Sequence, residues 1–182
     1  MTLVIVLAAV AVLALGFIFL YNRLVRRRNR VDNAWSQVDV QLRRRYDLIP
    51  NLVETVKGYA SHEQETFEAV VQARNAAQAA ASVDEQAGAE GVLGSALRRL
   101  FALAEQYPQL RASENFQALQ RDLAETEDRI AVARQIYNDT VLTYNNSVQT
   151  VPTNVVAAAT GFRTREFFEI DEQARGVPKV DF

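Results

Sequence analysis

The feature that most constrains this chain is an uninterrupted apolar run close to its N-terminus. Residues 3–20, LVIVLAAVAVLALGFIFL, contain no charged side chain. With the next two residues the run reaches about 20, the length that an α-helix needs to cross about 30 Å of hydrocarbon. A cleaved signal peptide is the alternative, but no Lys or Arg precedes the run, and arginine follows it where small residues would form a cleavage site. We therefore expect residues 1–22 to form a transmembrane helix.

The charges beside this run predict the orientation of the chain. Arginines follow its C-terminal end, whereas its N-terminal side carries only the α-amino group. The positive-inside rule then places the remainder of the chain in the cytoplasm. We expect the residues that flank the span to lie at the membrane interface, with the tyrosine as an aromatic anchor: Tyr21, Arg23, Arg26, Arg27, Arg28 and Arg30.

The remaining composition argues against nucleic acid and against most catalytic sites. Residues 23–45 hold eight Arg against two Asp, but residues 46–182 hold 12 basic against 20 acidic side chains, which would repel a phosphate backbone. The chain has no cysteine, which excludes disulfides, thiolate metal sites and cysteine nucleophiles. Its one histidine, His62, cannot form an HExxH metal site, because Thr66 stands four residues on. We expect no enzyme activity, no metal and no cofactor.

Apolar residues recur with a helical period beyond the span, which predicts an all-α chain. The first helix of the soluble part is expected over residues 23–45, continuous with the span. A break is expected at RRRYDLIPN, because Asp47 is a good N-cap and Pro50 suits the first turn of a new helix. The arginines of residues 43–45 would then lie in the last turn of the preceding helix, where positive charge stabilises the helix dipole.

Three further helices are expected after this break. The second runs over about residues 48–82, with a possible bend at Gly58, and its end at residues 75–81 is expected to reach lipid headgroups, with Arg74 on a phosphate. Residues 83–94 carry three glycines and predict a loop. A shorter helix ends at Tyr107, and a long one follows Ser113. The pattern predicts an antiparallel four-helix bundle over residues 23–150.

Polar and aromatic residues recur at intervals of seven within this pattern. Asparagine at a core position destabilises a bundle unless it is hydrogen-bonded, and it is known to fix helix register. A recognition stripe for a partner helix is the alternative interpretation. The tryptophan is expected to anchor the first helix in the bundle. These possible register or partner residues are Asn22, Asn29, Trp35, Tyr137, Asn138, Tyr144 and Asn145.

The C-terminal region, residues 151–182, differs from the bundle. VVAAATG predicts a short helix that ends at Gly161, and an extended segment is expected after it. Four of the nine Phe lie in the last 21 residues. They are expected either to pack against the bundle as a flap or to meet lipid together with nearby arginines. The residues of this possible lipid-facing tail are Phe162, Arg163, Arg165, Phe167 and Phe168.

Several long segments resemble one family. Residues 21–63, which include RNRV and DLIPNLVETVKGY, are similar to the signature segment of the LemA family of bacterial membrane proteins, as are residues 116–145 and the ending PTNVVAAATGF. The resemblance covers essentially the whole chain. It implies a single-span inner-membrane protein with a cytoplasmic helical bundle and no catalytic residues. It also implies association with membrane metalloproteases or TPM-domain proteins, and one relative takes part in magnetosome formation.

Two functional hypotheses follow. The first is a non-enzymatic scaffold or adaptor that recruits, or oligomerises with, other inner-membrane proteins, with protease-linked quality control as one candidate process. The second is direct membrane remodelling, in which the basic and aromatic segments bind lipid. The first accounts for the long helices and the lack of reactive side chains, and the second for the dipolar distribution of charge.

Overall fold

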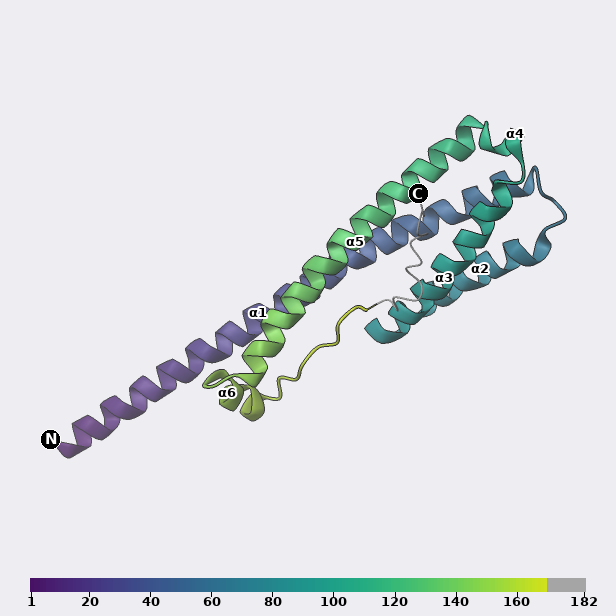
Figure 1. Ribbon diagram of the computed structural model, residues 1–182. Helices are drawn as coiled ribbons and strands as arrows, with labels where there is room; N and C mark the ends of the chain where they lie inside the picture. The colour runs from purple at the N-terminus through teal and green to yellow at the C-terminus, as the bar shows by residue number, and fades with distance from the viewer. Residues whose placement is uncertain (170–182) are drawn as a thin grey trace, which may run out of the picture. The chain divides into compact units, whose positions relative to one another are not determined.

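The computed structural model describes residues 1–169, and every regular element in that range is an α-helix (Figure 1). This confirms the predicted all-α class, while the end of the predicted tail, residues 170–182, lies outside the described residues. The helices are α1 (Thr2–Lys57), α2 (Gln64–Ala79), α3 (Val83–Ala104), α4 (Pro108–Arg111), α5 (Glu114–Gln149) and α6 (Thr153–Thr160).

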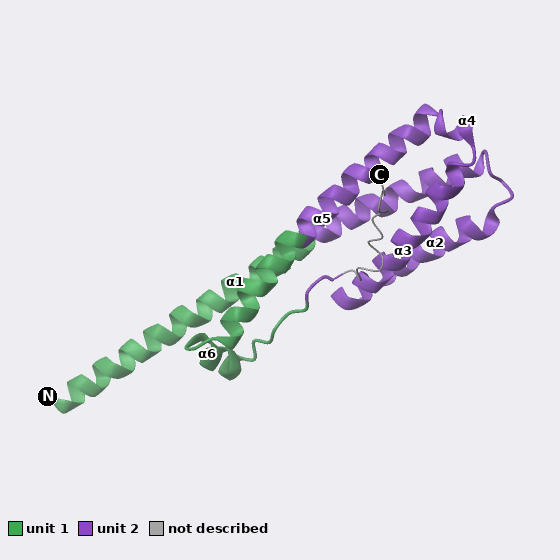
Figure 2. Ribbon diagram, in the orientation of Figure 1, with its two compact units in different colours: residues 1–37, 135–166 green, residues 38–134, 167–182 purple. Residues whose placement is uncertain are grey.

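The chain divides into two compact units (Figure 2). Unit 1 comprises residues 1–37 and 135–166, and unit 2 comprises residues 38–134 and, within the described range, residues 167–169. Helices α1 and α5 therefore each contribute to both units. The apolar run forms the first part of α1, and α1 is the one described helix long and apolar enough to cross a membrane.

The predicted helix break near Asp47 is wrong, because α1 continues through Pro50 to Lys57. Proline lacks the N–H that would bond the carbonyl four residues earlier, which normally interrupts a helix. Here that carbonyl, on Tyr46, accepts a hydrogen bond from Nε of Arg74 on α2 at 2.7 Å. The apolar stripe of α1 also continues across the proline, with Ile49 and Leu52 fully buried.

Arg74 therefore bonds within unit 2 instead of meeting a phosphate, and Ala77 is 1% exposed. Asn75, Ala76, Gln78 and Ala79 are exposed, so contact of residues 75–81 with headgroups stays a prediction. The predicted helix over residues 48–82 is also divided in two, by a turn that begins at Gly58. In that turn the amides of Tyr59 and Ala60 both donate to the carbonyl of Val56.

The predicted loop over residues 83–94 is wrong as well, since these residues form the first half of α3. A reciprocal cap starts the helix: Ser82 Oγ accepts from the amide of Glu85 at 3.1 Å, and the Glu85 carboxylate accepts from the amide of Ala81 at 2.9 Å. Buried residues such as Leu93 and Leu97 then supply the apolar side of α3, and α3 packs against α2. This burial and the cap outweigh the low helix propensity of the three glycines.

The core of unit 1 includes the contact between the end of the apolar run and α6, the helix that follows α5. Leu24 of α1 packs with Val156 and Ala157 of α6, and partly buried Leu20, Val148 and Phe162 surround them. Helix α6 ends at Gly161, whose φ of 76° reverses the chain. The extended segment that the pattern predicts follows, and it runs back along α5 (Figure 1).

Candidate functional site

A buried ion pair lies at the centre of unit 2. Arg45 of α1 is 4% exposed and Glu90 of α3 is 2% exposed. The Arg45 guanidinium contacts the Glu90 carboxylate and also lies 2.6 Å from the carboxylate of Glu127 on α5. Breaking such a buried pair leaves an uncompensated charge, which destabilises a fold far more than the intact pair stabilises it. The three helices are thus joined through one guanidinium.

A second layer of hydrogen bonds surrounds Glu90. The hydroxyl of Tyr46 donates to the Glu90 carboxylate, and Gln86 Nε2 donates to the same carboxylate at 2.9 Å and to the Tyr46 oxygen at 2.8 Å. Gln86 also donates to the carbonyl of Ala77 on α2 at 3.1 Å. Burial raises the pKa of Tyr46, so its hydroxyl remains a donor at neutral pH. The polar network therefore includes residues from α1, α2, α3 and α5.

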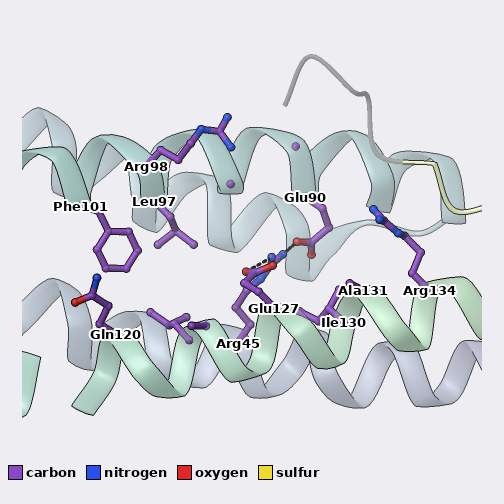
Figure 3. Close-up of a pocket in the computed structure, with 14 residues that line it drawn as sticks. Arg45, Glu90, Leu97, Arg98, Phe101, Gln120, Glu127, Ile130, Ala131 and Arg134 are labelled. Atoms are coloured by element: carbon purple, nitrogen blue, oxygen red, sulfur yellow. Dashed lines mark hydrogen bonds and ion pairs between the residues drawn. The ribbon is translucent and has the colours of Figure 1, made fainter. Parts of the chain in front are cut away.

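A cavity of about 460 Å³ adjoins this network between α3 and α5 (Figure 3). Gly91 and Gly94 line it from α3 and leave room there because they have no side chain. Arg98 and Arg134 also line it, from α3 and α5, and Arg45 and Glu127 lie between these two arginines in Figure 3. The apolar part of the lining is Leu97, Phe101, Leu123, Ala124, Ile130 and Ala131.

The lining of this cavity combines apolar side chains with charged ones. Both carboxylates in the lining, Glu90 and Glu127, contact Arg45, and the other charged lining residues are the arginines at positions 98 and 134. Within residues 1–169 no three His, Cys, Asp or Glu side chains gather to hold a metal ion. The cavity offers apolar surface together with guanidinium groups, a combination that suits an apolar segment carrying negative charge.

The predicted membrane-interface residues have two structural roles. Arg23, Arg26 and Arg30 are exposed, as expected for residues that meet headgroups. Arg27 instead donates to the carbonyl of Thr143 on α5 at 3.0 Å. The other two predicted interface residues contact Phe162: the Arg28 guanidinium lies 5.2 Å from its ring centre, and the Tyr21 ring packs edge-on at 5.8 Å.

The predicted register residues separate into two groups. Asn22 and Asn29 are exposed, so a register role inside a core does not fit them, and Asn138 is half-buried. Trp35 is also half-buried, with its ring centre 5.2 Å from that of Tyr137. The first helix is therefore anchored by a shared ring contact, with part of the indole left at the surface.

The remaining residues of this set hold the C-terminal segment. Asn145 bonds the backbone of Arg165 twice, accepting from its amide at 2.8 Å and donating to its carbonyl at 2.9 Å. The hydroxyls of Tyr137 and Tyr144 donate to the carbonyls of Glu166 and Arg163 at 2.9 and 2.8 Å. These side chains pair with an extended backbone, so their role is to dock the tail on α5.

The predicted lipid-facing tail is largely packed against the protein. Phe168 is fully buried and Phe162 lies in the unit 1 core, so a lipid-facing role does not fit either ring. Arg165 lies 3.0 Å from the carboxylate of Asp32 on α1. Phe167 is 38% exposed and Arg163 is exposed. The flap interpretation accounts for most of these residues.

Sequence reasoning missed the members of the buried network. Arg45 follows Leu42 by three residues and precedes Ile49 by four, which places it on the apolar stripe of α1. The same signal marks Glu90, three residues before Leu93. We interpreted the first as a helix-end charge and the second as part of a loop, and both interpretations followed from the misplaced helix boundaries.

Comparison with known proteins identifies the family. The pattern of the LemA family matches residues 34–182, most of the chain. The chain belongs to the LemA family. This confirms the resemblance seen in its signature segments, and the LemA match includes every residue of the buried network and the cavity.

Named relatives extend the comparison. Magnetosome proteins MamQ 1 and MamQ 2 of Paramagnetospirillum magneticum are each 30% identical to this chain over 190 residues, covering 90% of this chain and 70% of the relative. Protein LemA of Metamycoplasma hominis is 28% identical over 171 residues, covering 90% of this chain and 78% of the relative. Together with the apolar start of α1, these similarities describe a membrane-associated helical protein.

Proposed function

We propose that this LemA family protein is a membrane-anchored adaptor that binds a segment of another inner-membrane protein in the cavity between α3 and α5. The observation that carries the proposal is the cavity itself: an apolar lining of about 460 Å³ next to a buried network that joins four helices. A pocket supported by packed helices and locked side chains is preorganised for binding, which reduces the entropy lost on association.

The charge of the lining defines the kind of segment that would fit. Arg45 contacts Glu90 and Glu127, and Arg98 and Arg134 are the other basic residues of the lining. We expect an apolar segment with one or more acidic residues, because opposite charge both steers the encounter and fixes its orientation. The family resemblance points to a membrane metalloprotease or a TPM-domain protein as its source.

Site-specific photocross-linking of the full chain in native membranes tests this proposal. A photoreactive amino acid at Ala131, which lines the cavity, should yield a cross-link to one identified membrane protein. The matched control is Val132, which is 60% exposed and absent from the lining. Consecutive helical residues point about 100° apart, so the two probes sample different surfaces at the same level of α5.

Filling the cavity provides the second half of the test. Gly94→Leu places a side chain where only an Arg98 nitrogen lies within 4 Å of the new Cβ, and should abolish the cross-link while circular dichroism shows the helices intact. Equal yields from Ala131 and Val132, or a yield that Gly94→Leu leaves unchanged, would contradict the adaptor role. A cross-link to a second copy of this chain would also contradict the adaptor role and would indicate self-assembly instead.

A second candidate is direct organisation of the membrane, and two exposed valines that follow α5 favour it. Val151, in the turn between α5 and α6, is 79% exposed, and Val155, in α6, is 67% exposed. The similarity to proteins named as magnetosome proteins is compatible with such a role. Imaging of vesicles that contain the full chain at increasing density tests it: unchanged vesicle shape at all densities would exclude remodelling.

A further inference from the structure

A surface at the α5–α6 corner of unit 1 lies next to the apolar run of α1. We infer that this corner, residues 150–161, rests in the interface of the bilayer that the apolar run enters, as a second lipid contact of the chain. The inference depends on the membrane anchoring of the chain and is independent of the adaptor role of the cavity.

The register between α1 and α5 fixes the level of the corner along α1. The two helices run antiparallel, with Trp35 beside Tyr137 and Arg27 bonded to the carbonyl of Thr143. Because both helices rise by about 1.5 Å per residue, continuing this register by six residues places Gln149 level with Tyr21. The turn after α5 is therefore level with the C-terminal end of the apolar run.

Packing independently gives the same level. Leu20, the last residue of the apolar run, contacts the cluster formed by Leu24 of α1 and Val156 and Ala157 of α6. Helix α6 thus lies directly against the residues at which the span emerges. A helix in this position is at the headgroup region of any membrane that the apolar run crosses.

The composition of the corner matches that location. No residue between Asp139 and Arg163 carries a charged side chain, and the other long uncharged stretch of the chain is its first 22 residues. The buried face of α6 is used for packing, whereas Val151, Val155, Ala158 and Ala159 are exposed. An exposed apolar face without charge is unfavourable in water and favourable at the acyl boundary.

Exposed arginines lie beside the α5–α6 corner and beside the end of the apolar run. Arg163 lies two residues after the corner, and Arg23 and Arg26 follow the apolar run on α1; all three are exposed. Guanidinium groups at this level can pair with lipid phosphate while the valines insert. The arrangement, apolar residues followed by arginines on two adjacent segments, fits a bilayer better than a protein partner.

Depth-dependent quenching on the full chain tests the inference. The chain has no cysteine, so single cysteines introduced at Val151 or Val155 can be labelled with an environment-sensitive fluorophore. In vesicles of phosphatidylethanolamine and phosphatidylglycerol we expect a blue-shifted emission, quenching by shallow spin-labelled lipids, and several-fold weaker quenching by aqueous iodide than at the control site. That control is Leu142, which is 51% exposed on α5 and lies seven residues, about 10 Å, before the last residue of that helix.

A second variant makes the test independent of any one label. Val155→Asp, read by the label at Val151, should raise iodide quenching toward the value at Leu142, because a charged side chain disfavours insertion. Iodide quenching at Val151 and Val155 as strong as at Leu142 would overturn the inference, and so would a Val151 signal unaffected by Val155→Asp. Neither result affects cross-linking from the cavity, so failure here and failure of the adaptor role are distinguishable.

Discussion

At the scale of single residues, Arg45 is a buried charged residue in the middle of unit 2. Its charge is buried and neutralised by carboxylates from two other helices, one of which is itself buried. Such a pair specifies one alignment of α1, α3 and α5, because a shift of α1 or α3 would separate two charges that are both buried. The same alignment positions the walls of the cavity.

Arg45→Met should therefore destabilise the protein by about 3–5 kcal/mol, since it leaves Glu90 buried without its partner. Removing both charges, in Arg45→Met with Glu90→Gln, should recover part of that loss. Thermal unfolding of the full chain in detergent measures both. Arg43→Met is the control, because Arg43 pairs with Asp39 at the surface, and a loss as large as that of Arg45→Met would show that burial is not the cause.

A second prediction concerns Pro50 of α1 and the side chain that bonds the carbonyl left without a backbone donor. Arg74→Met should cost about 1–3 kcal/mol, because the Tyr46 carbonyl would lose its donor. In a Pro50→Ala background the new backbone N–H can bond that carbonyl, so the same substitution should cost clearly less. A double-mutant cycle by thermal unfolding checks the coupling, with exposed Arg121→Met as the control. Additive effects would refute the explanation given for the uninterrupted helix.

Three buried tyrosines should make the folded state less stable at alkaline pH. Burial raises the pKa of Tyr46, Tyr137 and Tyr144. A group whose pKa is higher in the folded state than in the unfolded chain, near 10 for tyrosine, contributes stability that is complete below that value and is lost as pH rises through the folded pKa. The melting temperature should fall above about pH 10. Phenolate absorbance followed with circular dichroism measures this, and Tyr46→Phe should flatten the fall.

At the scale of elements, helix ends follow local bonding more than local composition. Helix α3 starts at a reciprocal Ser82 and Glu85 cap despite the glycines that follow it, and α1 crosses a proline because another helix supplies the missing donor. Helix α6 ends where Gly161 adopts a positive φ, and the amide of Phe162 then donates to the carbonyl of Ala157 at 3.0 Å. Gly161 thus directs the tail back along α5.

Glycine substitutions in two elements should have opposite effects. Gly161→Ala should destabilise by about 1 kcal/mol, because nothing obstructs the new Cβ and only the left-handed backbone is unfavourable. Gly88→Ala in α3 should instead stabilise by about 0.5–1 kcal/mol, since that site is helical and also open. Melting temperatures of the two variants provide the comparison. Equal signs would show that the φ at position 161 does not govern the effect.

At the scale of the whole molecule, the orientation in the membrane is the property on which the adaptor role depends. A cytoplasmic reporter fused after Phe182 should be active and a periplasmic reporter inactive, because the arginines follow the apolar run. Replacing exposed Arg23, Arg26 and Arg30 with Gln and adding arginines before residue 3 should invert the pattern. Arg27 and Arg28 are left in place, since they contact Thr143 and Phe162. An active periplasmic reporter on the natural chain would contradict this topology.

The sequence by itself determined the helical class, the apolar run, the arginines beside it, the family and the helix end at Gly161. Each of these depends on composition, period or a local motif, which a single segment carries within itself. Only the tertiary structure decided that α1 crosses Pro50, that residues 83–94 are helical, and that Arg45, Glu90 and Tyr46 meet beside a cavity. The physical reason is that a buried charge or an orphaned carbonyl is tolerated only when a distant residue satisfies it, and that partner is known only once the helices have packed.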